Sequence, residues 1–332
     1  MKYLWALLVV AAPAIAAPPT APVVLDDFET SSAWSAAPAS GVTMKLGSEP
    51  GPHGNALRVD FDFHGGGGYA VLHRKLDLDL PENYRFEYSI RGETAPQNLE
   101  LKLIDDSGEN VWWLNRVNFE YPRVWTTDRV RKRQITFAWG PRGGGELHHV
   151  AALEFAITAG SGGKGTVWFD DLKLVPLPVP GVPPPVVATA SSFVRGHEAA
   201  FAADTLESTW WESLSGDREP SLTLDLGTSR EFGGLVLDWR AGRHATDYDV
   251  EFDDGDGKWR TVREVRGADG ARDWLDLPES EARRVRLTMK AKPASTVALA
   301  SVRVMPLEWA ATPDAFLMAV AKDSPRGHYP RA

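Results

Sequence analysis

Residues 57–63 read LRVDFDF, with an apolar residue at every second position and a charged residue between. Successive side chains of a β-strand point to opposite faces of the sheet, so a period of two buries one face and exposes the other. The same alternation recurs in residues 84–90 (YRFEYSI), 99–103 (LELKL) and 153–157 (LEFAI). Because one-sided burial is typical of antiparallel sheets, we predict an all-β domain over residues 23–175.

Further strands are expected around these segments, at residues 23–28, 111–119, 131–138 and 166–175. Residues 176–185 then read PLPVPGVPPP. Repeated proline fixes φ and removes backbone donors, which favours an extended and semi-rigid chain. We therefore interpret residues 176–185 as a linker between two domains.

The period of two continues beyond the linker. Alternating apolar residues occur at 222–226, 235–239, 248–252, 285–289 and 302–304. Turn residues such as DDGDG at 253–257 separate these segments. They predict a second β-sandwich or barrel over residues 186–306.

Residues 307–332 follow a different pattern. Thr312 is placed to cap a helix, and Phe316, Leu317 and Val320 then share one face of it. A helix with one apolar face must bury that face on something. We expect its partner to be a further domain beyond this chain, such as a catalytic domain.

The N-terminus has the features of an export signal. Lys2 precedes an apolar run at residues 4–10, and AIA at 14–16 supplies the small residues that signal peptidase accepts. The apolar run is shorter than the roughly 20 residues that a transmembrane helix needs. We predict a signal peptide over residues 1–16 and a mature protein that is secreted or periplasmic.

The composition of the 332-residue chain excludes several classes of function. It contains no cysteine, which excludes disulfides, thiol catalysis and zinc–thiolate sites. A net charge of −9 without a basic stripe argues against a nucleic-acid partner. Glycoside hydrolysis needs a pair of carboxylates, and the best available pair is Glu120 with Glu154. Nothing in the sequence marks these two residues as catalytic. We therefore expect no enzymatic activity within these residues.

Six motifs follow one another in the second half of the chain: ATASS at 188–192, AADTLESTWWES at 202–213, DLG at 225–227, ATDY at 245–248, GKW at 257–259 and RRVRL at 283–287. In this order and spacing, residues 186–306 resemble the discoidin family, also called coagulation factor V/VIII type C. The resemblance implies a jelly-roll-like β-sandwich that binds ligands with loops at one end.

Two further motifs open and close the first domain, DDFE at 26–29 and WFDDL at 168–172. They resemble the first and last strands of galactose-binding-like carbohydrate-binding modules, and pairing them would bring the ends of the domain together. For the whole chain, the two resemblances imply two galactose-binding-like β-sandwich (jelly-roll) domains in tandem, with a short C-terminal helical tail.

The motifs of the first domain contribute five carboxylates: Asp26, Asp27, Glu29, Asp170 and Asp171. Calcium prefers hard oxygen ligands of this kind, and the resemblance implies a structural calcium ion at Asp27, Glu29 and Asp171. Solvated turn carboxylates are the alternative interpretation. In the second domain, Thr205 and Ser301 stand where the family's calcium site has other residues, which argues against a second ion.

Tryptophan is the main functional clue, with 13 in the chain. Sugars present apolar C–H faces that stack on aromatic rings. The aromatic candidates in the first domain are Trp112, Trp113, Phe119, Tyr121, Trp125 and Trp139. Trp112 and Trp113 are adjacent on one strand and must face opposite sides, so one belongs to the core and the other is free for the open face. We select Trp113 and Trp125 as ligand-binding residues.

The end loops of the second domain carry another set of candidates: Arg195, His197, Trp210, Arg240, Arg243 and His244. Arg and His donate hydrogen bonds to hydroxyls while an aromatic ring stacks, and a solvated charged rim is the alternative. We expect Trp210 to be exposed, and Trp211 and Trp259 to lie in the core. Membrane-binding relatives expose apolar loop tips; the sequence reveals none here, so phospholipid is the weaker ligand.

The sequence therefore predicts a secreted, non-catalytic protein that binds a polysaccharide or a cell-surface glycan. Binding would use aromatic stacking and hydrogen bonds from loop Arg and His, with calcium as the one cofactor expected. One alternative is the targeting part of a truncated glycan-active enzyme. The other is a cell-surface adhesion module that binds protein or lipid.

Overall fold

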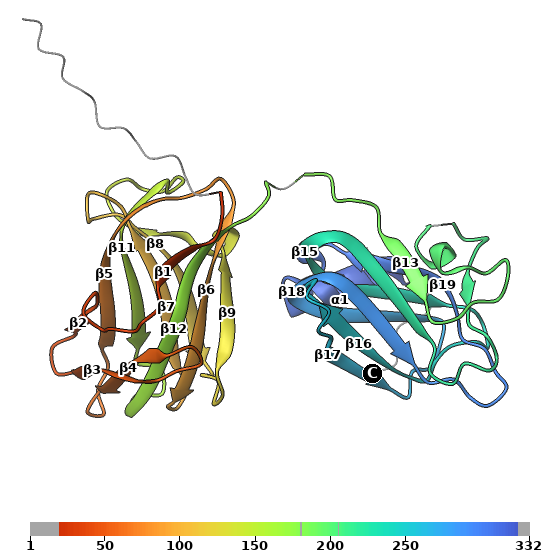
Figure 1. The fold of residues 1–332 in the computed structure, drawn as a ribbon, viewed down its shortest axis with the longest axis horizontal. Helices are drawn as coiled ribbons and strands as arrows, with labels where there is room; N and C mark the ends of the chain where they lie inside the picture. Colours follow the sequence, from red (N-terminus) through yellow and green to blue (C-terminus); the bar gives the residue numbers. More distant parts are fainter. Residues whose placement is uncertain (1–19, 180, 205, 325–332) are drawn as a thin grey trace, which may run out of the picture. The chain divides into compact units, whose positions relative to one another are not determined.

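The computed structural model describes residues 20–179, 181–204 and 206–324 (Figure 1). The chain divides into two compact units, Met1–Pro180 and Gly181–Ala332. Both are built from antiparallel strands, and the described residues contain one short α-helix. The predicted fold class, two β-sandwiches with a short C-terminal helix, is confirmed. The predicted signal peptide, residues 1–16, lies outside the described residues.

Unit 1 consists of two antiparallel sheets. The first joins β3 (Thr43–Pro50), β4 (Asn55–Asp62), β12 (Lys164–Pro176), β6 (Tyr84–Glu93) and β9 (Thr126–Arg131), with β1 (Val23–Asp26) paired to β12. The second joins β10 (Thr136–Trp139), β8 (Val111–Phe119), β7 (Gln97–Ile104), β11 (His149–Thr158), β5 (Tyr69–Asp79) and β2 (Ser35–Pro38). The pairing of β1 with β12 brings the ends of the unit together, as the motifs predicted.

The alternating apolar residues of both sheets meet in one core. Phe61 of β4, Phe169 of β12 and Phe155 of β11 are buried in it. The rings of Phe155 and Phe169 stack with their centroids 4.5 Å apart. Full burial of an aromatic side chain of this size stabilises the fold by about 1.5–3 kcal/mol, so this core holds the unit together without disulfides.

The sequence prediction was incomplete around β9 and β10. Residues 131–138 were predicted as one strand, but a turn of 3-10 helix at Lys132–Gln134 divides β9 from β10. The strands β2, β3 and β5 were not predicted.

Unit 2 is a single sheet that folds over on itself. In pairing order its strands are β14 (Trp211–Glu212), β19 (Ala298–Met305), β15 (Ser221–Trp239), β18 (Arg272–Met289), β16 (Asp247–Asp253) and β17 (Arg260–Arg266), with β13 (Val187–Ala190) paired to β15. Turns of 3-10 helix at Ala199–Ala202 and Leu307–Ala310 and the helix α1 (Pro313–Asp323) complete it. No helix among the described residues is long and apolar enough to cross a membrane.

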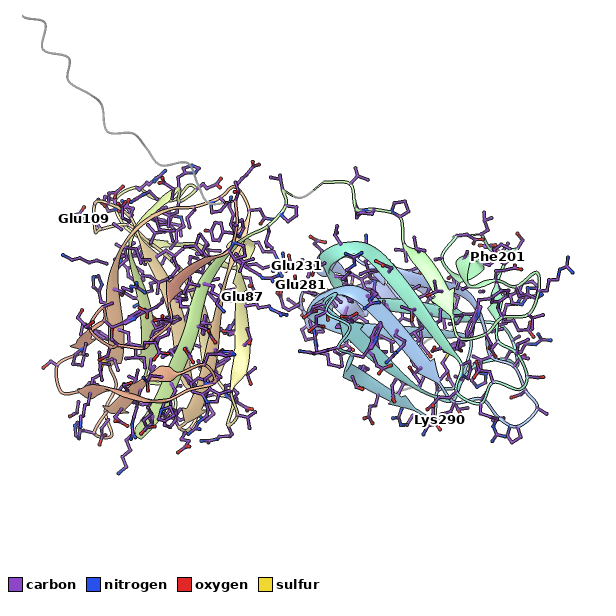
Figure 2. The ribbon with its side chains drawn as sticks, viewed as in Figure 1. Glu87, Glu109, Phe201, Glu231, Glu281 and Lys290 are labelled. Atoms are coloured by element: carbon purple, nitrogen blue, oxygen red, sulfur yellow. The ribbon has the colours of Figure 1, made fainter. Side chains whose placement is uncertain are left out.

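The length of β15 and β18 explains how one sheet makes two layers. The first half of β15 pairs with β13 and the second half with β19, and bulges interrupt its pairing with β18 in between. Figure 2 labels Glu231 and Glu281, which face each other at this turning point, and Lys290 at the opposite end. Residues 222–226 and 235–239, predicted as separate strands, are the two halves of β15.

The helix α1 begins where the sequence predicted. Thr312 caps it, because its Oγ1 accepts a hydrogen bond from the backbone N–H of Ala315 at 3.1 Å. Pro313 is the first helical residue, a position where the missing N–H of proline leaves no hydrogen bond unmade.

The apolar face of α1 packs on unit 2 itself. Phe316 and Val320 contact a small cluster that contains Val236 and Trp309, and the rings of Phe316 and Trp309 meet edge to face. The expectation that this face requires a further domain is therefore wrong. Leu317, predicted on the same face, instead points outward and is 62% exposed.

Candidate functional site

A continuous row of side chains crosses the second sheet of unit 1. From β10 to β2 the cross-strand partners are Thr136, Trp113, Lys102, Glu154, His73 and Ser35. Their neighbours along the strands, such as Trp112 and Phe155, are buried in the core. Because successive side chains alternate between faces, the row points away from the core. We call this outer surface of the sheet the sheet face.

Two tryptophans form the aromatic part of the sheet face. Trp113 of β8 and Trp139 of β10 meet edge to face, with ring centroids 5.4 Å apart and planes at 83°. Trp139 is 46% exposed, and Trp113 is half-buried. An irregularity in the pairing of β10 with β8 between Phe137 and Trp139 shifts the register, which turns Trp139 to the same side as Trp113.

Four ionisable side chains lie beside this pair. Lys102 Nζ lies 3.0 Å from Glu100 Oε2 and 4.0 Å from Glu154 Oε2. The same Nζ lies 5.7 Å from the ring centroid of Trp139, and His73 Nδ1 lies 2.9 Å from Glu154 Oε1. Carboxylates accept hydrogen bonds, whereas lysine donates them. The side chains of Lys102 and Glu154 are 12% and 18% exposed and Glu100 is buried, so the sheet face offers a few recessed donors and acceptors beside the exposed ring of Trp139.

Two of the other residues considered in unit 1, Trp125 and Glu120, do not join the sheet face. Trp125 lies in the loop after β8, whereas Trp113 lies near the start of that strand. Glu120 lies in the same loop, and Glu154 lies on β11 opposite Lys102. The structure thus separates Trp125 from Trp113, and it separates the two carboxylates considered for glycoside hydrolysis.

Arginine covers tryptophan at several other positions. Trp168 is 5% exposed, with the guanidinium carbon of Arg91 4.2 Å from its ring centroid. Trp259 has Arg286 at 4.1 Å and is half-buried outside the hydrophobic core of unit 2, so its prediction as a core residue is wrong. Trp211 is fully buried, as predicted. A planar guanidinium stacks on an aromatic face. The rings of Trp168 and Trp259 are therefore covered by arginine and closed to a sugar.

The ligand residues predicted in unit 2 come from loops at one end of that unit, which we call the loop end. These loops comprise the described residues of 191–210 (all but 205), 240–246, 267–271 and 290–297, together with residues 213–220 between β14 and β15. Backbone hydrogen bonds tie the second loop to β19: Arg240 N–H donates to Ala298 O at 3.0 Å, and Ala298 N–H donates to Arg243 O at 2.8 Å. The fold thus fixes the loop between Trp239 and Asp247 against the edge of β14 and β19.

Trp210 is the centre of the predicted set, but its ring is already engaged. The imidazole of His197 stacks on it with centroids 4.0 Å apart and planes at 23°. The guanidinium carbon of Arg240 lies 4.3 Å from the same ring centroid. Trp210 is half-buried rather than exposed as predicted, because side chains of the protein lie on its ring.

Glu212 is the residue at the loop end that the sequence prediction missed. It is 6% exposed, accepts hydrogen bonds from Trp210 Nε1 at 3.1 Å and Thr296 Oγ1 at 2.9 Å, and forms a salt bridge with Arg243. Burial alone raises the pKa of the Glu212 carboxyl, but these hydrogen bonds and the charge of Arg243 outweigh it and lower the pKa. Glu212 therefore orders His197, Trp210, Arg240 and Arg243 into one cluster.

The remaining two predicted residues lie apart from this cluster. Arg195 is exposed, and its charge acts on Glu198. His244 packs against the backbone of Gly270, since a Cβ at Gly270 would lie 2.4 Å from His244 Nδ1. The structure therefore brings together four of the six residues predicted for this end.

The loop end also exposes apolar side chains, contrary to the sequence prediction. Phe193, Leu206 and Leu214 are 48%, 57% and 50% exposed. They were not recognised because Leu206 and Leu214 are single apolar residues among polar ones and Phe193 has only Val194 beside it. The fold shows that their loops share one end. This surface differs from the sheet face in having apolar tips around a closed tryptophan.

The carboxylates predicted to hold calcium are mostly satisfied by other protein groups. Glu29 accepts both hydrogen bonds from Asn55, from the backbone N–H at 3.2 Å and from Nδ2 at 3.1 Å. Asp171 Oδ2 lies 2.7 Å from His53 Nδ1, and Asp27 accepts a weak hydrogen bond from the backbone N–H of Glu29. Across the described ranges, no three His, Asp or Glu side chains converge as a metal cage.

Asp170 is the exception among these carboxylates. It is fully buried, and its Oδ2 has no hydrogen-bond partner. Burial raises the pKa of the Asp170 carboxyl, which disfavours its charged form. The backbone of Gly51 lies close to this oxygen, because a Cβ at Gly51 would lie 2.7 Å from it. One buried acceptor fits a cation, and the remaining oxygens would have to come from backbone carbonyls and water.

Residues 187–303 match the F5/8 type C domain. The discoidin resemblance of the second half of the chain is thereby confirmed. No curated protein matches the chain.

Similar solved structures include several carbohydrate-binding modules. Chitosan-binding module 1 of a chitosanase/glucanase from Paenibacillus sp. IK-5 is 27% identical over 36% of this chain and 94% of the module, with a TM-score of 0.34. The family 32 module of NanJ from C. perfringens, in complex with galactose, is 19% identical over 36% and 92%, with a TM-score of 0.34. The family 11 module of a cellulosomal cellulase of Clostridium thermocellum is 18% identical over 49% and 97%, with a TM-score of 0.40.

Proposed function

We propose that this protein binds a polysaccharide through the sheet face of unit 1. The observation that carries the proposal is the pair of Trp113 and Trp139. The planes of their rings meet at 83°, and Trp139 is 46% exposed. Aromatic rings offer a rigid apolar surface for the C–H face of a sugar. Beside them, Lys102 donates and Glu154 accepts hydrogen bonds, as sugar hydroxyls require.

The dimensions of the sheet face favour a chain over a single sugar. The row from Thr136 to Ser35 crosses six strands. Neighbouring strands lie about 4.8 Å apart, so five spacings amount to about 24 Å. That length suits several consecutive sugar units, laid across the strands.

Unit 2 contributes a second and weaker carbohydrate site in this proposal. At the loop end Arg240 and Arg243 can donate hydrogen bonds to hydroxyls, but Trp210 offers little free ring because His197 stacks on it. Two sites in one chain raise the overall affinity by avidity when both reach the same polymer.

The protein acts in this proposal as a binding module without chemistry of its own, outside the cytoplasm. The pattern of residues 1–16 supports export. The alternative of a targeting part of a truncated enzyme has lost the observation that favoured it, because α1 packs on its own unit.

Adhesion to a lipid surface is the second candidate function. It is favoured by the exposed side chains of Phe193, Leu206 and Leu214 at the loop end. Sedimentation with phosphatidylserine vesicles tests it: co-sedimentation that a triple substitution of these residues by serine abolishes would support adhesion. Absence of co-sedimentation removes this candidate.

The test of polysaccharide binding uses the mature chain from residue 17. Affinity electrophoresis in gels that contain different soluble polysaccharides should show retardation by one class. The double variant Trp113→Ala/Trp139→Ala should migrate as freely as in an empty gel, while Trp125→Ala, outside the sheet face, should keep the retardation. A folded wild-type chain that no polysaccharide retards would refute the proposal.

We also propose a structural calcium ion at Asp170 in unit 1. The buried, unpartnered Oδ2 of this residue supports the proposal, because an uncompensated buried charge is costly. With calcium bound, a chelator should lower the melting temperature, and Asp170→Asn should remove that sensitivity. If no ion binds, chelator has no effect, and Asp170→Asn leaves the fold as stable or stabilises it.

A further inference from the structure

Unit 1 contains a cavity at the end where the linker begins, apart from the sheet face. It lies between the loop that joins β5 to β6, the 3-10 turn at Lys132–Gln134 and the loop before β11, and it has a volume of about 610 Å³. Its lining includes Tyr84, Trp112, Ile135, Glu146, Leu147 and Val179. Ligand sites for small molecules typically enclose about 300–1,000 Å³, so this cavity is large enough for one.

Much of the cavity wall is apolar. Tyr84, Trp112 and Leu147 belong to the hydrophobic core of unit 1. Ile135 packs against that core, and Val179 lines the cavity while remaining 54% exposed. Trp112 Nε1 already donates to a backbone carbonyl at 2.8 Å. A sugar has a hydroxyl on most of its carbons, and walls of this kind would leave several of them without a partner, which is costly. The cavity therefore suits a ligand with an apolar body.

The hydroxyl of Tyr84 is a polar group of this wall that lacks a partner. Tyr84 is 3% exposed, and no group among the described residues forms a hydrogen bond with its hydroxyl. This oxygen is not among the fully buried unpaired atoms, and the charge of Glu146, another lining residue, acts on it. The other three buried tyrosines of the described chain each have an acceptor: Tyr88 donates to Asp128, Tyr121 to Asn98 O and Tyr248 to Asp273. The hydroxyl of Tyr84 therefore faces the cavity and is available to a ligand.

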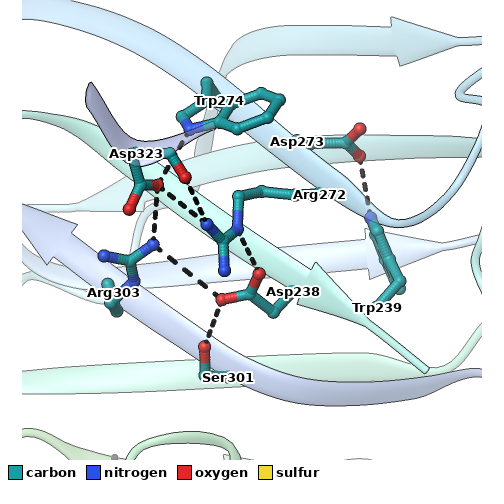
Figure 3. Close-up of polar contacts among 8 residues, drawn as sticks. All are labelled: Asp238, Trp239, Arg272, Asp273, Trp274, Ser301, Arg303 and Asp323. Atoms are coloured by element: carbon teal, nitrogen blue, oxygen red, sulfur yellow. Dashed lines mark hydrogen bonds and ion pairs between the residues drawn. The ribbon is translucent and has the colours of Figure 1, made fainter. Parts of the chain in front are cut away.

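The polar groups beneath α1 in unit 2 show the opposite situation. Figure 3 shows Asp323 of α1 with its three partners, which are Trp274 Nε1 at 3.0 Å, Arg272 at 3.2 Å and Arg303 at 3.0 Å. This carboxylate is satisfied by the protein itself, so it fixes α1 on the sheet and is not available to a ligand. Most buried polar groups are satisfied in this way, and the hydroxyl of Tyr84 departs from that rule beside an open cavity.

The charged residues of the lining balance one another. Two are acidic, Glu82 and Glu146, and two are basic, Lys132 and Arg133. Lys132 Nζ forms a salt bridge with Glu146 and donates to Glu82 O at 2.6 Å, and its hydrogen bond lowers the pKa of the Glu146 carboxyl. Burial and the charge of Glu146 raise the pKa of Tyr84, so its hydroxyl stays protonated and can donate. The cavity therefore favours an uncharged ligand that carries a hydrogen-bond acceptor.

The first residues of the linker form one wall of the cavity. Leu177 N–H donates to Asn83 O at 2.9 Å, and Asn83 Nδ2 donates to Pro178 O at 2.7 Å. These two hydrogen bonds attach the segment to unit 1 and hold Val179 in the lining. A ligand in the cavity would therefore contact the linker as well as the core of unit 1.

We propose that this cavity binds a small uncharged aromatic compound that accepts a hydrogen bond from the hydroxyl of Tyr84. Aromatic rings pack favourably against one another, and Tyr84 and Trp112 supply two rings to the wall. The proposal goes beyond polysaccharide binding, because it concerns another class of ligand and shares no residue with the sheet face. It stands even if the sheet face binds no polysaccharide.

The test uses methyl benzoate, an uncharged aromatic ester whose carbonyl accepts hydrogen bonds. It is titrated into the mature chain, and assigned NMR spectra follow the indole N–H of Trp112 and the backbone N–H of Val179. Both signals should shift. Benzoate, which has the same ring with a negative charge, and methyl glucoside, an uncharged sugar, should each bind at least fivefold more weakly.

Two variants connect these shifts to the cavity. Tyr84→Phe removes only the hydroxyl and should weaken the binding of methyl benzoate about threefold or more. Its melting temperature should not fall, because the hydroxyl has no partner among the described residues. Val179→Trp fills the cavity from its exposed side and should abolish binding. The matched control is Tyr69→Phe, the same change at an exposed tyrosine of β5, which should alter neither affinity nor stability.

Three results overturn the proposal. One is that methyl benzoate moves neither Trp112 nor Val179 up to its limit of solubility. Another is that Tyr84→Phe or Val179→Trp binds it with the affinity of the wild type. The third is that benzoate or methyl glucoside binds as tightly as methyl benzoate. Failure of the polysaccharide proposal is recognised separately, because it appears as unretarded migration in the gel assay.

Discussion

The sheet face of unit 1 and the loop end of unit 2 contain the same kinds of side chain in different arrangements. Each has a tryptophan, a cation and a carboxylate within a few ångströms. At the loop end, Arg240 and His197 lie 4.3 Å and 4.0 Å from the ring centroid of Trp210. On the sheet face, Lys102 lies 5.7 Å from that of Trp139. The first tryptophan is closed, and the second is open.

The difference follows from the chemistry of the two cations. The planar guanidinium of arginine stacks on a ring and covers it. The ammonium group of lysine is a compact charge, and Glu100 holds Lys102 at 3.0 Å, away from the ring. A surface tryptophan therefore becomes a platform for sugars only where the protein does not already cover it.

The largest expected effect is a loss of stability when Glu212 at the loop end is replaced. Glu212→Ala leaves Trp210 Nε1 and Arg243 without their buried acceptor, and it should lower the free energy of unfolding by about 2–4 kcal/mol. Urea denaturation measures this. The control, Glu264→Ala on the exposed surface of β17, should change stability by less than about 0.5 kcal/mol. Equal effects would mean that Glu212 does not organise the loop end.

The next prediction sets the two tryptophans directly against each other. Trp139→Ala should weaken polysaccharide binding at least tenfold, which corresponds to about 1.4 kcal/mol, because it removes the open ring. Trp210→Ala should weaken binding by less than threefold. Isothermal titration calorimetry with the polysaccharide found in the gel screen measures both. The reverse order of effects would show that the loop end is the main site.

A gain-of-function variant tests whether His197 and Arg240 keep a sugar from the ring of Trp210. In the Trp139→Ala background, Arg240→Ala/His197→Ala should uncover the ring of Trp210 and restore binding by about two- to fivefold, since one exposed aromatic contact is worth about 0.5–1 kcal/mol. Arg195→Ala, which removes a charge outside the cluster, is the control and should restore nothing. Unchanged binding in both variants would show that covering side chains are not the cause.

The smallest expected effect is a pH dependence at the loop end. The pKa of Glu212 is lowered in the folded protein, so its charged form adds stability above its usual pKa of about 4.3, and this contribution is lost as the pH falls through the lowered value. The stability difference between wild type and Glu212→Gln should thus be present at neutral pH and shrink below about pH 4. Melting curves at several pH values measure it; a constant difference would argue against the lowered pKa.

The strands that the sequence predicted best are those with one solvent-exposed face and one buried face. Leu57, Val59 and Phe61, which alternate with charged residues in the sequence, are all buried in β4. In contrast, β5 begins YAVL, and Ala70, Val71 and Leu72 are all buried. Where both faces of a strand are covered, the alternation disappears, and the prediction has no pattern to follow.

The site was predictable only where adjacent residues decide the geometry. Trp112 and Trp113 had to face opposite sides, and the structure buries Trp112 and leaves Trp113 on the sheet face. Trp139 joins Trp113 through an irregularity in strand pairing, which involves two strands separated in sequence. Glu212 escaped prediction because its partners, Thr296 and Arg243, come from other loops.

The sequence by itself determined the features that depend on neighbouring residues: the period of two, the helix that begins after Thr312, and the opposite faces of adjacent tryptophans. The tertiary structure decided which tryptophans are open to a ligand. That choice depends on whether a cation from a distant strand or loop lies on the ring, as Arg240 does on Trp210, or is held away from it, as Lys102 is from Trp139. Such contacts are set by the packing of segments far apart in the chain, and no local pattern encodes them.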